Sequence, residues 1–171
     1  MRLFIAILFD REFTEALAEY QNRLRAQGVR GRFTPRENLH LTLAFIGEYH
    51  SPDKALEAMK AADFAAVELR PEKAGFFGDL LWAGVSGDPA LAEYAKRLRR
   101  ELAKRQIPCD KKRFFPHVTL VRRAERSRDF AFPPLPAAGM RACRVSLMKS
   151  EQGKNGMLYT ELGSIAPTAS V

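Results

Sequence analysis

The sequence predicts an α+β protein in which antiparallel sheets carry helices on their outer faces. The chain has 171 residues, of which 46% are hydrophobic and 28% charged, a composition typical of one globular domain rather than of a disordered chain. Apolar residues recur with period 2 in some segments and with helical period in others, which separates strands from helices. The segments follow in the order strand, helix, strand, helix, two strands, helix, strand and a final pair of strands. This order is typical of α+β folds.

The first third of the chain predicts a strand, a helix and a second strand. The apolar run at 3–9 is too short to span a bilayer and is expected to be a buried strand. Apolar residues three and four apart from Phe13 onward predict an amphipathic helix that ends near Gly28. A basic loop follows. Residues 38–46 alternate strictly, which predicts a strand with two distinct faces: Leu39, Leu41, Leu43 and Phe45 on one, and His40, Thr42 and Ala44 on the other.

The middle of the chain predicts two helices that enclose a strand pair. Ser51 is expected to cap the first of these helices, with Pro52 at its first position, and the helix is expected to end near Ala62. Residues 65–76 and 80–85 are expected to be strands joined by a Phe-Gly-Asp turn. A second capped helix starts at Asp88-Pro89, and its run of lysines and arginines is interpreted as a solvated face.

The last third predicts strands only. Residues 115–121 alternate, and the proline-rich stretch after them suits a loop. Residues 141–149 and 157–162 are expected to close the fold as a hairpin, followed by a tail that frays after about residue 164. We expect residues 1–171 to form a single domain.

Charge and cysteine content narrow the function classes. Lysine and arginine number 28 against 20 acidic residues, a net charge of +8, so the surface favours an anionic partner such as nucleic acid or a phosphorylated small molecule. Cys109 and Cys143 are too few for a disulfide framework and lack the spacing of a metal or redox site. With no secretion signal or membrane-length segment in the sequence, we expect a soluble, cytoplasmic protein.

One constellation occurs twice. His40 and Thr42 lie two residues apart in NLHLTLAF, and His117 and Thr119 do the same in FPHVTLVR. On a strand, residues i and i+2 share a face, so each copy presents an imidazole and a hydroxyl together, opposite an apolar face. A single copy on the solvent face of a strand would be unremarkable. Two of the three histidines in matched copies, each preceded by a basic-aromatic segment, predict one shared cleft.

The residue types favour phosphate chemistry over metal binding. A metal site needs further ligands, and neither copy has a Cys, Asp or Glu two residues after its histidine. A threonine hydroxyl can instead donate to a phosphate oxygen while the imidazole moves a proton. In-line displacement at phosphorus places the attacking and leaving oxygens on opposite sides, which suits one histidine as base and one as acid. The two motifs are nearly symmetric, so their residues alone do not say which histidine has which role.

The paired motifs closely resemble those of the two-histidine phosphoesterases, and in particular the RNA 2′,3′-cyclic phosphodiesterases, also called 2′-5′ RNA ligases. The resemblance extends from MRLFIAI through NLHLTLAFIGE and PHVTL to a closing pattern of Ser150, Gly156 and Tyr159. It implies a bilobal fold with a pseudo-two-fold repeat around a central cleft, no metal and no cofactor. It also implies hydrolysis of a terminal 2′,3′-cyclic phosphate to a 2′-phosphate, and it allows a reversible 2′-5′ RNA ligase activity.

The same resemblance implies roles for the motif residues. His40 would be the proton donor and His117 the proton acceptor, with Thr42 and Thr119 on the phosphate oxygens. Four further residues are predicted to bind substrate: Arg122, which follows the second motif, Arg113, Phe33 and Arg36. A guanidinium can hold phosphate in bidentate fashion, and an aromatic ring can stack a base. Phe33 stands where the family often has tryptophan.

Three function classes remain open at this point. The first is a metal-independent enzyme, expected to be a monomer, that acts on RNA with a 2′,3′-cyclic phosphate terminus. The second uses the same chemistry on a small cyclic nucleotide or a 2′-5′ oligonucleotide. The third is a non-catalytic RNA-binding module. Two intact motifs disfavour the third class, and the basic segments beside them favour the first over the second.

Overall fold

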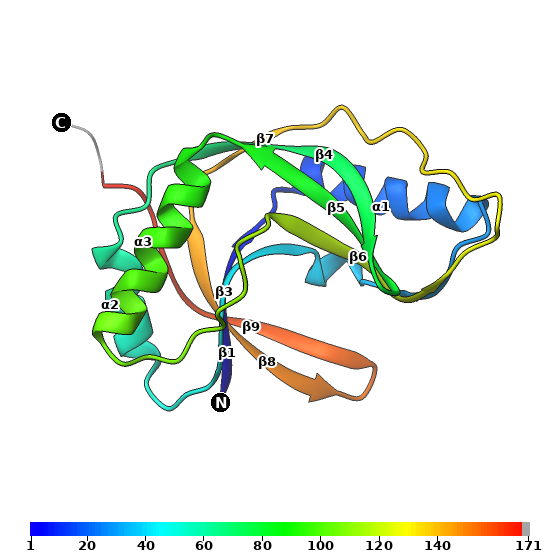
Figure 1. Cartoon of the computed structure of the whole chain (residues 1–171). Helices are drawn as coiled ribbons and strands as arrows, with labels where there is room; N and C mark the ends of the chain where they lie inside the picture. The colour runs from blue at the N-terminus through cyan, green and yellow to red at the C-terminus, as the bar shows by residue number, and fades with distance from the viewer. Residues whose placement is uncertain (169–171) are drawn as a thin grey trace.

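The computed structural model describes residues 1–168, apart from the side chains at positions 86 and 87. Its helices and strands, shown in Figure 1, follow in the order β1 (Arg2–Leu8), α1 (Arg11–Ala26), β2 (Arg30–Phe33), η1 (Arg36–Asn38), β3 (His40–Glu48), α2 (Pro52–Ala61), β4 (Val67–Phe77), β5 (Leu80–Gly87), α3 (Ala90–Lys104), β6 (His117–Glu125), β7 (Met140–Ala142), β8 (Val145–Gly153) and β9 (Gly156–Ile165). No helix among these residues is both long and apolar enough to cross a membrane.

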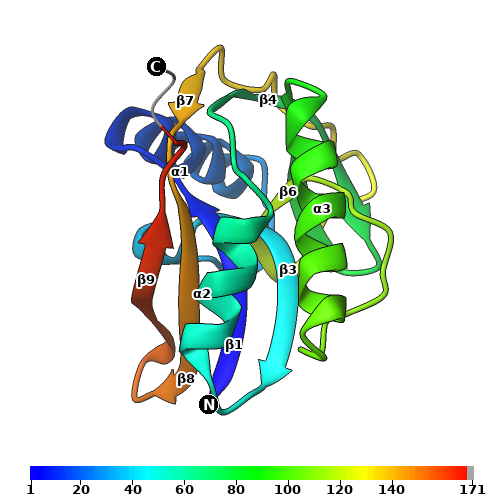
Figure 2. The same ribbon diagram turned by 90° about the vertical axis from the view of Figure 1, so that its left-hand side faces the viewer.

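Two antiparallel sheets form the framework. The first sheet has the order β3-β1-β8-β9 and the second the order β2-β6-β5-β4-β7. Helices α2 and α3 lie side by side over the first sheet (Figure 2), while α1 packs on the second sheet, where its Gln21 side chain donates to the Leu120 carbonyl of β6. The main apolar core lies between these helices and the sheets. The predicted α+β class, with helices on the outer faces, is confirmed.

Side-chain oxygens bind backbone amides at the start of two helices. The Asp10 carboxylate accepts a hydrogen bond from the Phe13 amide of α1 at 2.8 Å, and the Asp88 carboxylate, at the helix start that was expected to be capped, accepts one from the Ala90 amide of α3 at 3.0 Å. The expected cap of α2 is wrong in detail, because Ser51 occupies the N-cap position but its side chain makes no capping hydrogen bond. Pro52 starts this helix as predicted, since its missing N–H is one that a helix start leaves unpaired anyway.

Two strands were not expected. The basic loop after α1 contains β2, which pairs with β6 because Gly31 lets the backbones approach closely: a Cβ on Gly31 would lie 2.7 Å from the Arg123 carbonyl oxygen. The segment predicted as one strand at 141–149 is divided. Its beginning belongs to β7, which pairs with β4 in the second sheet, and its remainder belongs to β8 of the first sheet. The chain therefore crosses between the sheets within the predicted strand.

The chain end is ordered somewhat further than predicted. Strand β9 continues to Ile165, which pairs with Val145, and the Thr168 hydroxyl donates to the Asp63 carboxylate at 3.3 Å. Residues 169–171 of the predicted frayed tail lie outside the described residues.

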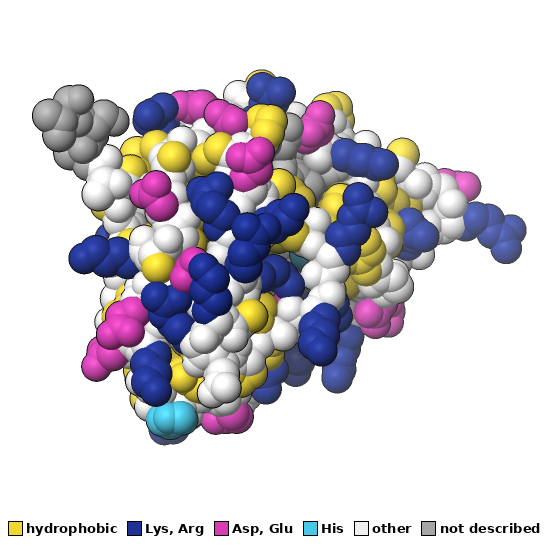
Figure 3. All heavy atoms as spheres, turned by 60° about the vertical axis from the view of Figure 1, so that its left-hand side comes forward, with side chains coloured by type: hydrophobic (Ala, Val, Ile, Leu, Met, Phe, Trp, Pro, Cys, Tyr) yellow, Lys and Arg dark blue, Asp and Glu magenta, His cyan; other side chains and the backbone are white. Residues whose placement is uncertain are grey.

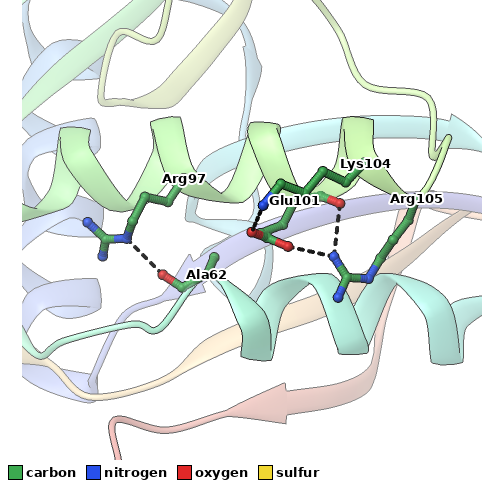
Figure 4. Close-up of polar contacts among 5 residues, drawn as sticks. All are labelled: Ala62, Arg97, Glu101, Lys104 and Arg105. Carbon is green, nitrogen blue, oxygen red and sulfur yellow. Dashed lines mark hydrogen bonds and ion pairs between the residues drawn. The ribbon is translucent and has the colours of Figure 1, made fainter.

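Three basic side chains of the run at α3, which was expected to be a solvated face, form hydrogen bonds within the protein (Figure 4). Arg97 donates to the Ala62 carbonyl at the end of α2, at 2.9 Å, and so satisfies a carbonyl that the helix leaves free. The Glu101 carboxylate accepts from Lys104 at 3.0 Å and from Arg105 at 2.6 Å. These three basic side chains thus stabilise α2 and α3 locally.

Candidate active site

The two histidines occupy corresponding places in the two sheets. His40 is the first residue of β3 and His117 the first residue of β6, and these two strands contact each other although they belong to different sheets. Thr42 and Thr119 follow on the same faces, and all four side chains are half-buried, while the residues between them are fully buried on the opposite face. We call the face with these four side chains the histidine face of each sheet.

Both imidazole rings are held through the same nitrogen. Nδ1 of His40 lies 2.7 Å from the carbonyl oxygen of Asn38, and Nδ1 of His117 lies 2.6 Å from that of Phe115. Because a carbonyl can only accept, each Nδ1 carries the hydrogen, and the neutral ring then has its lone pair on Nε2. Each Nε2 can therefore accept a proton, or donate one after it has been protonated.

A β-bulge in β3 changes which side chains share the histidine face. Along the β1 pairing, Ile5 is opposite Ala44 but Ala6 is opposite Thr42, so β3 has one extra residue. The predicted strict alternation is therefore wrong beyond this point, because an extra residue reverses the parity of the strand. Ala44 is buried in the main core, and Phe45 lies on the histidine face.

Strand β6 has the same irregularity at the same distance from its histidine. Leu81 of β5 is opposite Val121, but Trp82 is opposite Thr119. Val121 is consequently fully buried, and Arg122 is placed on the histidine face beside the second motif. Without the bulge, Arg122 would have pointed toward the core.

Helix α1 braces this second bulge. The Leu120 carbonyl accepts hydrogen bonds from the Gln21 side chain at 3.0 Å and from the Thr34 amide at 2.9 Å. Gln21 is buried, and its amide also donates to the Thr34 carbonyl at 3.0 Å. These bonds satisfy the carbonyl of the bulged residue from the β2 side of β6 and so fix the strand that carries Arg122.

The surroundings of His40 are apolar and electropositive. Its ring lies against Phe4 and Tyr159, with ring centroids 5.1 and 5.3 Å away. Burial lowers the pKa of His40 below its ordinary value, the proximity of Arg122 and His117 lowers it further, and the hydrogen bond to Asn38 opposes the decrease only in part. His40 is therefore neutral in the free protein at neutral pH.

The surroundings of His117 are aromatic and open. Phe77, Trp82 and Phe115, which we call the aromatic shelf, have ring centroids 5.6, 6.5 and 5.7 Å from that of His117. Phe77 is 50% exposed and Phe115 43% exposed, which is unusual for such large apolar side chains and leaves flat rings available to a ligand.

The other predicted substrate residues differ in their placement. Arg113 is exposed in the segment between α3 and β6. Arg36 forms an ion pair with Glu15 of α1 at 2.6 Å. Phe33 lies under the Arg25 guanidinium at 4.0 Å and packs against the main core. The structure thus brings Arg122 to the two motifs, whereas Arg36 and Phe33 are engaged elsewhere and do not favour a substrate contact.

Several residues at the site were not predicted as site residues. Asn38 is buried and joins two parts of the first sheet, because its side chain donates to the Met157 carbonyl of β9 at 2.9 Å while its own carbonyl holds His40. Tyr159 was part of the closing sequence pattern but was not predicted to lie at the site, and its ring contacts that of His40. The aromatic shelf draws on three separate segments, so no local pattern could have identified it.

No group of three or more His, Cys, Asp and Glu residues within positions 1–168 is arranged to hold a metal ion. The donors that the site does offer are two imidazoles, two hydroxyls and one guanidinium, a set suited to an oxyanion.

Comparison with known proteins assigns the family. A family model described as the 2′-5′ RNA ligase superfamily matches residues 11–154. The chain belongs to this superfamily. Proteins named RNA 2′,3′-cyclic phosphodiesterase are similar to it over most of their length. The Thermus thermophilus protein is 31% identical, and the match covers 95% of this chain and 88% of the relative. The Escherichia coli protein is also 31% identical, and the match covers 78% of this chain and 77% of the relative.

Similar solved structures confirm the predicted bilobal fold. Escherichia coli LigT in its apo form matches with a TM-score of 0.81 at 26% identity, covering 98% of both chains. LigT in complex with 3′-AMP matches with a TM-score of 0.80 at 27% identity, again covering 98% of both chains. The resemblance inferred from the paired motifs is thereby confirmed.

Proposed function

We propose that this superfamily member is an RNA 2′,3′-cyclic phosphodiesterase, a hydrolase that opens a terminal 2′,3′-cyclic phosphate to a 2′-phosphate. The observation that carries the proposal is the pair of histidine-threonine motifs on contacting strands of two sheets, each with its Nε2 available. The Thermus thermophilus and Escherichia coli relatives are named for this activity. We also propose that the protein acts as a cytoplasmic monomer without metal or cofactor.

The proposed reaction uses both histidines in one in-line displacement. Nε2 of His117 accepts a proton from a water molecule as the water oxygen bonds to phosphorus, the bond from phosphorus to O3′ breaks, and Nε2 of His40 donates a proton to O3′. Thr42 and Thr119 donate hydrogen bonds to the non-bridging oxygens, and Arg122 stabilises their charge. The 2′-phosphate remains on the ribose. The same sequence with an RNA 5′-hydroxyl in place of water joins that oxygen to phosphorus, leaves a 2′-5′ linkage and a free 3′-hydroxyl, and is the ligation reaction.

The assignment of His40 as the acid makes proton uptake part of substrate binding. His40 is neutral in the free protein, because its pKa is lowered by burial and by the nearby positive charges. A phosphodiester anion bound beside the ring opposes both effects and favours the protonated form. His40 is therefore charged as the substrate binds, when an acid is needed.

Two alternatives keep the same site but change what it does. A small cyclic nucleotide or a 2′-5′ oligonucleotide would meet the same donors, and a relative, LigT, has been solved with 3′-AMP. A non-catalytic RNA-binding module would need the phosphate contacts but no free Nε2 on either ring. The available Nε2 atoms favour catalysis over this last alternative.

The test is hydrolysis of an RNA oligomer with a 2′,3′-cyclic phosphate end in the presence of EDTA, followed by identification of the product. We expect a 2′-phosphate and the same rate as without EDTA, because the site offers no metal ligand set. A 3′-phosphate product would contradict the proposal. Complete loss of activity in EDTA with recovery on adding zinc or manganese would contradict the metal-free mechanism.

A further inference from the structure

A basic groove lies outside the histidine site. It has a volume of about 910 Å³ and runs along α3 beside the segment that leads from α3 to His117. Figure 3 shows lysine and arginine side chains gathered across the middle of this side of the molecule. The lining residues are Ala92, Lys96, Arg99, Ala103, Ile107, Pro108, Cys109, Asp110, Lys111, Lys112, Arg113 and Phe114.

Four cations of the groove are free to meet an anion. Lys96, Lys111, Lys112 and Arg113 are exposed and have no carboxylate partner within the described residues. Asp110 is the one acidic residue in the lining, and its carboxylate is paired with Arg99 at 3.0 Å. The groove therefore keeps a surplus of positive charge.

The groove is fixed to the histidine site by backbone contacts. The Asp110 amide donates to the Phe45 carbonyl at 2.9 Å, and Arg99 donates to the Leu43 carbonyl at 3.4 Å, so the groove is attached to β3 at its bulge. At its other end, Phe114 lines the groove, and Phe115, the next residue, belongs to the aromatic shelf and orients His117. The lining of the groove is thus attached to β3 and continues along the chain into the segment that ends at His117.

A neighbouring cavity shows that the basic lining is particular to this side of Phe114. Phe114 also lines a cavity of about 450 Å³, where Glu72 and Asp88 stand beside a single lysine, Lys73. A polyanion that passes Phe114 is repelled by these two carboxylates and attracted by the lysines of the groove.

We propose that the groove holds the phosphodiester backbone of single-stranded RNA upstream of the terminal nucleotide. The inference rests on the proposed function and specifies its substrate class as an oligonucleotide rather than a cyclic mononucleotide. Lysine and arginine bind backbone phosphates without reading sequence, and they release condensed counterions as they do so. Affinity for the oligonucleotide therefore depends on salt through these side chains.

The test compares two double variants that remove the same charge. Lys111→Ala/Lys112→Ala removes two lysines of the groove, and Lys54→Ala/Lys60→Ala removes two exposed lysines of α2 that do not line it. Each variant is assayed for hydrolysis of a cyclic mononucleotide, and for binding of a short single-stranded RNA that already ends in a 2′-phosphate, over a range of salt concentrations.

We expect the groove variant to lose about tenfold in RNA affinity at low salt, and the slope of log K against log salt to decrease by about 1.4, since each phosphate contact on a single strand contributes about 0.7. Its loss on the mononucleotide should be much smaller, and the α2 variant should match the wild type in slope.

If both variants bind RNA with the same affinity and slope, the groove proposal is wrong, even though hydrolysis of the mononucleotide supports the function. If the wild type hydrolyses no cyclic phosphate, the proposed function is wrong, and the binding experiment still decides the groove. Binding of an acidic peptide that requires Lys111 and Lys112, with RNA binding independent of them, would assign the groove to a protein partner and also overturn the proposal.

Discussion

His40 and His117 share one arrangement and differ in what surrounds it. In each strand, Nδ1 of the histidine is held by the carbonyl two residues earlier, and the threonine follows two residues later. A bulge after the threonine then reverses which face of the sheet the following side chains occupy. The His40 ring, however, is enclosed by Phe4 and Tyr159, whereas the His117 ring lies beside the exposed rings of the aromatic shelf. The repeated motif provides two equivalent proton carriers, and the surroundings make them different.

The bulges place unlike residues at equivalent positions. Three residues after its threonine, β3 has Phe45, which packs on the apolar histidine face under the Arg2 guanidinium at 5.0 Å. At the same distance β6 has Arg122, whose positive charge lowers the pKa of His40. One half of the site therefore contributes a cation that acts on the histidine of the other half. This asymmetry gives the two histidines different electrostatic surroundings in a nearly symmetric fold.

The largest expected effect tests whether both halves are needed. His40→Ala and His117→Ala should each reduce kcat by about 10²- to 10⁴-fold, the contribution of one general acid or base. His50→Ala is the control, because His50 is exposed and lies beyond the end of β3. Full activity in both single variants would show that the motifs are not the catalytic site.

The next effect tests the residue that breaks the symmetry. Arg122→Met should lower kcat/KM by roughly 10- to 100-fold, because a hydrogen bond to a charged oxygen is worth about 1.5–3 kcal/mol. Arg36→Met is the matched control, since Arg36 is paired with Glu15. An equal loss in the two variants would place Arg122 outside the site.

A smaller effect is expected for the two hydroxyls. Thr42→Val and Thr119→Val keep the branched shape and remove one neutral hydrogen bond each, so each should lower kcat/KM by about 2- to 10-fold. Steady-state kinetics of both variants would measure this. A loss as large as that of a histidine variant would mean that the hydroxyl takes part in proton transfer.

The smallest effect is a shift in pH dependence, which tests whether Arg122 acts on His40. The limbs of the kcat/KM profile report pKa values of the free protein, and burial together with the proximity of Arg122 and His117 holds the pKa of His40 low. Arg122→Met removes a positive charge and so raises this pKa, which moves the limb that reports His40 to higher pH. A profile in which neither limb moves would show that Arg122 does not act on His40.

The features that follow from strand periodicity were predictable from the sequence, and those that need pairing partners were not. His40 and Thr42 share a face because period 2 is a property of the strand itself. The bulge that brings Arg122 to this face depends on β5, α1 and Thr34, none of which is visible in the local pattern.

Residue type alone does not show whether a side chain serves packing or ligand binding. Phe33 suited base stacking by type and position, but it pairs with Val121, whose side chain faces the core, and it therefore packs there with Arg25 above it. Conversely, Phe77 and Phe115 meet at His117 only after β4 and β6 have taken their places in the second sheet.

The central claim is that His40 and His117 act on one phosphate, and an NMR titration of the three histidines tests it most directly. A nucleoside 2′-monophosphate is added while the imidazole resonances of His40, His117 and His50 are followed. We predict that the resonances of His40 and His117 shift together, with the same half-saturation concentration, and that those of His50 stay unchanged because His50 lies beyond β3 in an exposed position. A response from only one of the two motif histidines, or saturation at two different concentrations, would contradict a shared phosphate site.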